Sequence, residues 1–269
     1  LALRDLGPVE TLVLGDFTAQ FGQGVALWQG LRLGKGRDPV SPVLQDGRGV
    51  LPYRSASEAN YFRGVAVTVG LPSAFSVTAF ASLRHRDASI DSSLAELSGP
   101  SAPIPVRTIS AGGYHRTPSE LARKGTFGET TVGGAVEYRG SSLHVGTAGY
   151  RSRFDRPLRP GDAPYRRFRV AGRRASMLTA YATAYMDDYT VFGEVARAPG
   201  GVYGGLLGAA LDAGDIADVI LLGRWYPPEL ENFHGNAFGG GGRPQNERGI
   251  YTGLRLRVAQ KWSLAAYFD

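Results

Sequence analysis

The amino-acid sequence predicts an all-β fold, specifically a transmembrane antiparallel β-barrel with about 12–14 strands in this chain, at the 9–11 residues that each spanning strand needs. Three observations support this prediction. Apolar and polar residues alternate with a period of two in many runs, short turns separate neighbouring runs, and a few connections are long and polar. Short turns at one end and long loops at the other are typical of outer-membrane barrels.

The clearest alternation is in residues 178–186, "LTAYATAYM". One face carries Leu178, Ala180, Ala182, Ala184 and Met186, and the other carries Thr179, Tyr181, Thr183 and Tyr185. In residues 250–258, Ile250, Thr252, Leu254, Leu256 and Val258 oppose Tyr251, Gly253, Arg255 and Arg257. Because an arginine at the lipid midplane costs roughly 2–4 kcal/mol, we expect Arg255 and Arg257 to face the lumen.

Similar runs predict strands along the whole chain, at about 9–19, 63–70, 73–84, 104–114, 129–139, 142–151, 189–198, 200–211, 216–226 and 262–269. Turn residues at 69–73, 139–142, 186–189 and 198–201 predict hairpins, whereas 35–54, 152–168 and 227–248 are long connections. No composition shift marks a domain boundary. We therefore expect a single β-barrel domain over 1–269, as a fragment of a longer chain.

Residues 14–36, "LGDFTAQFGQGVALWQGLRLGKG", also alternate, but one of the two faces is nearly bare. Read as a strand, this stretch turns Phe21, Val25, Leu27, Leu31 and Leu33 to lipid and Gly22, Gly24, Ala26 and Gly30 to the lumen. Glycines there leave room for another segment to pack closely against the backbone. An equally weighted interpretation is that they only allow the strand to bend.

Two short helices are predicted, because "SASEANYFR" (55–63) and "TPSELARKG" (117–125) both match the capping box. The second also has proline at the first helical position. We expect these helices to fill the lumen. The predicted polar network of the lumen consists of Asp16, Gln23, Glu58, Arg63, His115, Arg116, Glu120, Arg255 and Arg257.

Little in the sequence indicates catalytic chemistry. The chain has no cysteine, and His85, His115, His144 and His234 lack a metal-ligand spacing, so no metal site is expected. No G-x-S-x-G elbow is present. We therefore expect no cofactor and no enzymatic activity, although a barrel hydrolase that uses a histidine and loop carboxylates stays open as an alternative.

Positive charge is carried mainly by arginine, since only Lys35, Lys124 and Lys261 among the 30 basic residues are lysine. The net charge is +6. One dense cluster could hold phosphate on lipopolysaccharide or DNA, namely Arg166, Arg167, Arg169, Arg173 and Arg174. The favoured interpretation of this cluster is a solvated loop or barrel rim.

Four stretches resemble, in order, the barrel region of large helix-hairpin-helix domain proteins of Gram-negative bacteria. They are "LGDFTAQFGQGVALWQG", "PYRSASEANYFRGVAVT", "FASLRHRDA" and "SAGGYHRTPSELARKGTFGETTVGGAVEY". The residues that carry the resemblance are Gly15, Asp16, Phe21, Gly22, Gln23, Gly24, Ser55, Glu58, Arg63, Gly64, His115, Arg116, Thr117 and Glu120. The resemblance spans roughly residues 10–150 and implies an outer-membrane barrel. It also implies a link to DNA uptake through an N-terminal module that this chain lacks.

Together these features predict a porin-like protein of the bacterial outer membrane with a transport, channel or anchoring role. Its expected partners are outer-membrane lipid and lipopolysaccharide, with DNA as a further partner through the missing module. The competing interpretation is a secreted, soluble β-sandwich that binds carbohydrate on a platform of tyrosines and of Trp28, Trp225 and Trp262.

Overall fold

The computed structural model describes residues 1–32, 34–55, 60–91, 103–110, 112, 115–161, 163–241, 244–259 and 262–269. Its strands are β1 (Ala2–Leu6), β2 (Val9–Gln20), β3 (Gly49–Pro52), β4 (Phe62–Leu71), β5 (Phe75–Arg86), β6 (Ala88–Ile90), β7 (Val106–Ile109), β8 (Phe127–Arg139), β9 (Leu143–Leu158), β10 (Gly172–Tyr185), β11 (Tyr189–Ala198), β12 (Val202–Asp212), β13 (Ala217–Tyr226), β14 (Glu247–Ala259) and β15 (Trp262–Phe268). The helical elements are short: α1 (Pro118–Leu121) and the 3-10 turns η2 (Pro164–Arg166) and η3 (Pro199–Gly201). The predicted all-β class is confirmed.

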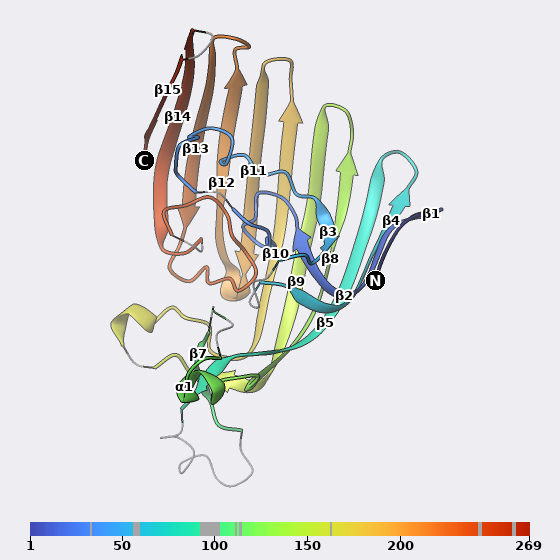
Figure 1. The fold of residues 1–269 in the computed structure, drawn as a ribbon, viewed down its shortest axis with the longest axis vertical. Helices are drawn as coiled ribbons and strands as arrows, with labels where there is room; N and C mark the ends of the chain where they lie inside the picture. The colour runs from blue at the N-terminus through green and yellow to red at the C-terminus, as the bar shows by residue number, and fades with distance from the viewer. Residues whose placement is uncertain are drawn as a thin grey trace.

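All fifteen strands belong to one sheet, which is antiparallel apart from a parallel contact between β7 and β9. Its main path runs β1-β2-β4-β5-β8-β9-β10-β11-β12-β13-β14-β15. In the described part of the chain β1 and β15 lie at opposite ends of this path and do not pair, so the sheet is open (Figure 1).

Neighbouring strands are joined as the turn residues predict. The turns expected at 69–73, 139–142, 186–189 and 198–201 fall at the β4–β5, β8–β9, β10–β11 and β11–β12 connections. Because consecutive strands are antiparallel, the connections β2–β4, β5–β8, β9–β10, β11–β12 and β13–β14 gather at the opposite end from β4–β5. All of them are long except β11–β12, whose short turn is therefore an exception to the expected separation of short turns from long loops. The connection predicted at 152–168 starts later than expected, because β9 continues to Leu158.

The two faces of the sheet differ in what covers them. We call the face that carries Met177, Thr179 and Tyr181 the inner face, since these side chains are buried under other parts of the chain. The outer face carries Leu178, Leu207 and other apolar side chains that stay exposed, with Leu207 at 66%. Residues that share the outer face in the strand registers include Val65, Val77, Val132, Val136, Val145, Leu178, Val191, Val195, Leu207, Leu221, Trp225 and Ile250.

The prediction that residues 14–36 form one strand is wrong. β2 ends at Gln20, and Gly22 (φ +59°) and Gly24 (φ +82°) then turn the chain onto the inner face. Phe21, Val25 and Leu27 are fully buried there and do not face outward. The alternation did not predict the structure here, because residues 21–28 form a loop in which odd- and even-numbered residues are both buried. Leu31 is 86% exposed, and Leu33 lies outside the described residues.

The second predicted helix is confirmed as α1, with its capping box intact. The Thr117 hydroxyl accepts from the Glu120 amide at 3.2 Å, and the Glu120 carboxylate accepts from the Thr117 amide at 3.1 Å. However, α1 buries no residue and lies beside β7 in Figure 1, away from the inner segments, so it does not fill the inner face as expected. Of the first predicted helix, residues 56–59 lie outside the described residues and Phe62 begins β4.

No helix in the described ranges has both the length and the apolar character needed to cross a membrane.

Candidate functional site

Two loop segments cover the inner face. The first inner segment is residues 21–48 without 33, and the second inner segment is residues 227–246 without 242 and 243; residues 33, 242 and 243 lie outside the described residues. Figure 1 shows them in blue and orange-red over the same face of the sheet. The segments are bonded to each other, because Asn232 Nδ2 donates to the carbonyl oxygens of Val25 (2.6 Å) and Ala26 (2.8 Å). The Trp28 amide also donates to the His234 carbonyl at 2.6 Å.

Glu194 on β11 fixes the first inner segment to the sheet. Its carboxylate is 3% exposed and accepts backbone hydrogen bonds from Gln23 (2.6 Å), Val25 (3.1 Å) and Ala26 (3.1 Å). Thr179 Oγ1 on β10 donates a fourth bond at 2.7 Å. Consecutive amides around one anion form a concave nest, which requires the chain to turn back on itself. The positive φ angles of the neighbouring glycines provide this turn.

Gly22 also lies against the sheet. A Cβ atom at Gly22 would stand 2.8 Å from the Tyr181 ring and 2.8 Å from Glu194 Oε2. The side chain of Tyr181 in turn lies across Gly146 on β9, so that its hydroxyl reaches Glu137 on β8 at 2.8 Å. Gly22 and Gly146 both pack against the Tyr181 ring, so a larger side chain at either position would collide with the ring.

Replacing Gly22 with alanine should therefore destabilise the protein more than its backbone angle alone would. The matched control is Gly200→Ala in η3, because Gly200 has φ +80° but nothing within 4 Å of a Cβ. Overpacking a tight contact costs about 1–3 kcal/mol, so Gly22→Ala should exceed the control by this amount in thermal unfolding followed by circular dichroism. Equal losses for the two variants would contradict the packing of Gly22 on Tyr181.

A second buried carboxylate, Glu137, gathers three donors. Tyr181 Oη donates to its Oε1, His144 Nε2 lies 2.9 Å from the same oxygen, and Arg139 Nη2 lies 3.0 Å from it. This cluster holds β8, β9 and β10 together on the inner face near their short turns.

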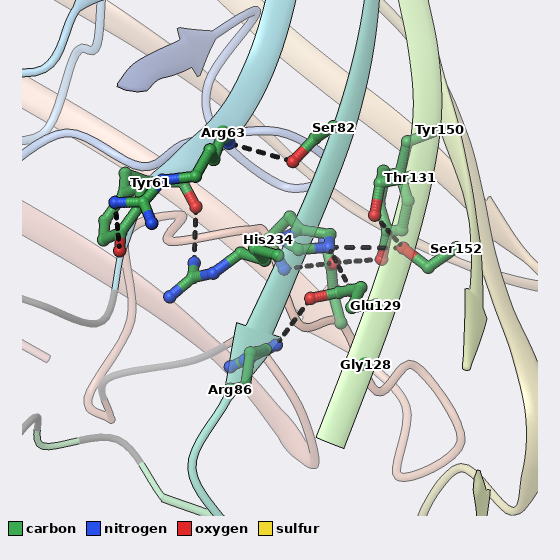
Figure 2. A network of polar contacts seen from close by, with 12 residues as sticks. Tyr61, Arg63, Ser82, Arg86, Gly128, Glu129, Thr131, Tyr150, Ser152 and His234 are labelled. Atoms are coloured by element: carbon green, nitrogen blue, oxygen red, sulfur yellow. Dashed lines mark hydrogen bonds and ion pairs between the residues drawn. The ribbon is translucent and has the colours of Figure 1, made fainter. Parts of the chain in front are cut away.

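The third buried carboxylate, Glu129, contacts the second inner segment through His234 (Figure 2). His234 Nε2 lies 3.1 Å from Glu129 Oε1, and Arg86 Nη1 donates to Glu129 Oε2 at 3.3 Å. The His234 ring packs between Phe62 and Tyr150, with centroid distances of 4.8 and 4.7 Å. Burial lowers the pKa of His234 below 6.5, although the Glu129 carboxylate opposes this shift.

Ser152, His234 and Glu129 do not have the arrangement of a catalytic triad. Ser152 Oγ lies 3.4 Å from His234 Nε2, which is the same nitrogen that contacts Glu129. In a triad the carboxylate binds one ring nitrogen and the serine the other. Ser152 is fully buried and also bonds to Thr131 Oγ1 at 2.7 Å, so its polar contacts are structural (Figure 2).

The two arginines of β14 share the inner face with Tyr251, whose hydroxyl donates to the Pro39 carbonyl at 2.8 Å. Arg255 forms ion pairs with Asp38 of the first inner segment and, at 3.3 Å, with Asp218 of β13. Arg257 pairs with Asp218 at 2.8 Å. Both arginines thus lie on the inner face of the open sheet.

Asp38 makes the contact between the first inner segment and β14 sensitive to acid. Burial by itself would raise the pKa of Asp38, but hydrogen bonds from Ser41, Val40 and Arg255 outweigh it and lower the pKa from 3.8 to about 2. Since the folded pKa is depressed, the stability from this carboxylate is fully present above about pH 4 and is lost as the pH falls through about 2.

We expect Asp38→Asn to lower the free energy of unfolding at pH 7 by about 1 kcal/mol or less, because the side chain is partly exposed. The difference from the original protein should disappear as the pH falls from about 4 to 2. Thermal unfolding at a series of pH values measures this, with Asp215→Asn, an exposed turn residue, as the control. A difference independent of pH would show that the charge of Asp38 is irrelevant.

The other predicted network residues do not meet at one place. Asp16 and Arg63 form an ion pair at 2.7 Å between β2 and β4, on the outer face that also carries Val65, and not on the inner face as expected. His115 Nε2 lies 2.7 Å from Asp87 Oδ2, and Arg116 pairs with Glu120 at 3.7 Å next to α1. Gln23 lies on the inner face, where its amide donates to the Gln45 carbonyl at 2.7 Å. Glu58 lies outside the described residues.

The remaining predicted residues also have separate environments. At Gly24 a Cβ would stand 2.7 Å from Gln45 Oε1, and at Gly30 it would collide with the Gln20 amide. The arginine cluster is divided, since Arg169 pairs with the buried Glu231 at 2.8 Å and Arg166 donates to the Pro160 carbonyl at 2.9 Å. Arg167 lies over the Phe168 ring, whereas Arg173 and Arg174 are exposed on β10.

Sequence reasoning missed the residues that organise the inner face, namely Glu129, Glu137, Glu194, Asn232 and His234. A usable signal existed for the carboxylates: Glu129 and Glu137 share the parity of Thr131, Gly133 and Ala135 within β8, which marks them as inward-facing. No periodicity could mark Asn232 or His234, because they belong to a loop. In the described residues, no group of three or more His, Cys, Asp or Glu side chains could hold a metal ion.

Comparisons with known proteins give no relative: no family model, no curated protein and no solved structure matches this chain.

Proposed function

We propose that this chain forms wall strands of a β-barrel in the bacterial outer membrane, with an interior occupied by its own inner segments. The observation that carries the proposal is the polarity of the sheet. Buried carboxylates, a histidine and arginines lie on the inner face, whereas the outer face exposes mainly valine, leucine, isoleucine and tryptophan side chains, together with Arg151, Arg197 and Arg248. A soluble sheet that packs its core on one side places polar residues on the other.

Strand length and loop placement support the same proposal. The strands from β8 to β14 are 10–16 residues long, which is enough to span a membrane at a tilt. Exposed aromatic side chains occur near the short turns, at Phe75, Tyr189 and Trp262, and towards the other end at Tyr203 and Trp225. Aromatic girdles at both interfaces are typical of membrane barrels.

The proposal requires that both free edges of the sheet be paired, by each other or by further strands, because unpaired backbone groups are not tolerated in lipid. The role that fits an occupied interior is anchoring or gated transport, without covalent chemistry. The rival carbohydrate platform loses support because Trp28 is buried within the first inner segment, while Trp225 and Trp262 are exposed on the outer face.

Expression with a secretion signal tests the proposed location. We expect the chain to fractionate with outer membranes and, when left unheated, to migrate at a different apparent mass on a detergent gel from the heated sample. A folded protein in the soluble fraction without detergent would contradict the barrel proposal.

A further inference from the structure

A cavity of about 680 Å³ lies between the first inner segment, the end of β2, and β3 with the residues that follow it. Four arginines line it, namely Arg4, Arg32, Arg48 and Arg54, and none of the described lining residues is a carboxylate. Gln29, Asn60 and Asn236 add uncharged polar groups. The described lining residues therefore carry four positive charges and no negative charge; residues 56–59, between the lining residues Ser55 and Asn60, lie outside the described residues.

The neighbouring cavity shows that a lining with arginines and without carboxylates is not common to all cavities on the inner face. A smaller cavity of about 340 Å³ is also lined by Arg48 and contains Arg139, but there Glu10 and Glu137 balance the two arginines. Only the larger cavity of this pair lacks acidic lining among the described residues.

The arginines of the larger cavity are held by neutral partners. Arg32 donates from Nε to Asn236 Oδ1 (3.3 Å) and from Nη2 to the Gly241 carbonyl (3.1 Å), and Arg48 Nε donates to Gln20 Oε1 (3.2 Å). Arg32 Nη1 is buried and has no hydrogen-bond partner among the described residues. These bonds orient the guanidinium groups of Arg32 and Arg48 through uncharged partners, while Glu247, which does not line the cavity, attracts Arg32 from a longer distance.

We propose that this cavity binds a ligand with two phosphate groups. Each phosphate carries a charge of about −1.5 to −2, so two of them balance four guanidinium groups. Guanidinium groups bind phosphate oxygens in pairs, which gives both affinity and orientation. The volume is within the range of about 300–1,000 Å³ that small-ligand sites occupy. The same chemistry is offered by a soluble diphosphate and by a phosphorylated lipid headgroup.

Calorimetric titration with inorganic pyrophosphate tests the site, in detergent or in buffer, whichever keeps the whole chain folded. We expect saturable binding that Arg32→Gln and Arg48→Gln each weaken by about tenfold or more, since each removes a charge-assisted hydrogen bond. Arg123→Gln, in the turn after α1, removes the same charge elsewhere and should leave binding unchanged. The double variant Arg4→Gln/Arg54→Gln should also weaken binding. Because it alters only exposed side chains, such a loss would not come from misfolding.

A second titration, with micelles that contain a diphosphorylated lipid or a neutral lipid, distinguishes the source of the phosphates. Arginine-dependent binding of pyrophosphate indicates a soluble ligand, and arginine-dependent binding of the phosphorylated lipid alone indicates a headgroup. Binding of neither probe, or binding that survives all of the substitutions, would overturn the proposal. Because the test needs only a folded chain, its failure leaves the membrane proposal unaffected.

Discussion

Replacing Glu194 with glutamine should lower the free energy of unfolding by about 2–4 kcal/mol, although the two side chains have the same shape. Two backbone amides point at one carboxylate oxygen, and one backbone amide and the Thr179 hydroxyl point at the other. Glutamine must turn its NH₂ group towards one of these pairs, so buried donors face another donor. Each buried donor without an acceptor costs about 1–3 kcal/mol.

The loss should also be local. Because Glu194 holds residues 23–26 to the sheet, Glu194→Gln should make the first inner segment accessible to protease before the sheet melts. Limited proteolysis and thermal unfolding measure the two effects together. Glu229→Gln, an exposed residue of the second inner segment, is the matched control and should behave like the original protein. If Glu194→Gln changes neither the proteolysis of the first inner segment nor thermal unfolding, the Glu194 carboxylate does not anchor this segment.

Leu207→Arg should destabilise the protein by about 2–4 kcal/mol if the outer face contacts lipid, which is the cost of arginine near the bilayer midplane. Leu207 is exposed on the outer face of β12, between Gly193 and Gly223 of the neighbouring strands. In water, the same change at an exposed position usually stays within about 0.5 kcal/mol. One substitution thus distinguishes the two solvents.

The measurement is urea unfolding of the chain refolded into phospholipid vesicles. Leu121→Arg is the matched control, because Leu121 is an exposed leucine of α1 outside the sheet and should tolerate arginine. Equal and small effects at both positions, in a chain that folds without lipid, would mean that the outer face is in contact with water.

Both expectations follow from one organisation. The inner face carries buried charged groups that bind two loop segments, so the chain itself covers this face, with Glu194 and the Glu129–His234 contact as its main attachments. Under the proposed function, a path through the barrel opens only if these contacts break. Substitutions of Glu194 and Glu129 are therefore the ones that would test gating.

The sequence by itself determined most of the strands and their faces, although others were not predicted, among them β3, which lies inside the connection expected at 35–54, and β6. Side-chain direction in a strand has a period of two, so "LTAYATAYM" specified that Tyr181 and Leu178 lie on opposite sides, and the turn residues specified the hairpins. The capping box of α1 was equally readable, because all of its contacts are within four residues.

Only the tertiary structure decided which segments occupy the inner face. The helices were expected there, but the glycine-rich residues 21–30 and the loop with Asn232 and His234 took that place. The contacts responsible join residues far apart in sequence, such as Glu194 to Gln23 and Tyr150 to Asn232. A loop folded around a buried carboxylate has no repeating pattern, since its conformation is set by distant partners, and periodicity therefore carries no information about it.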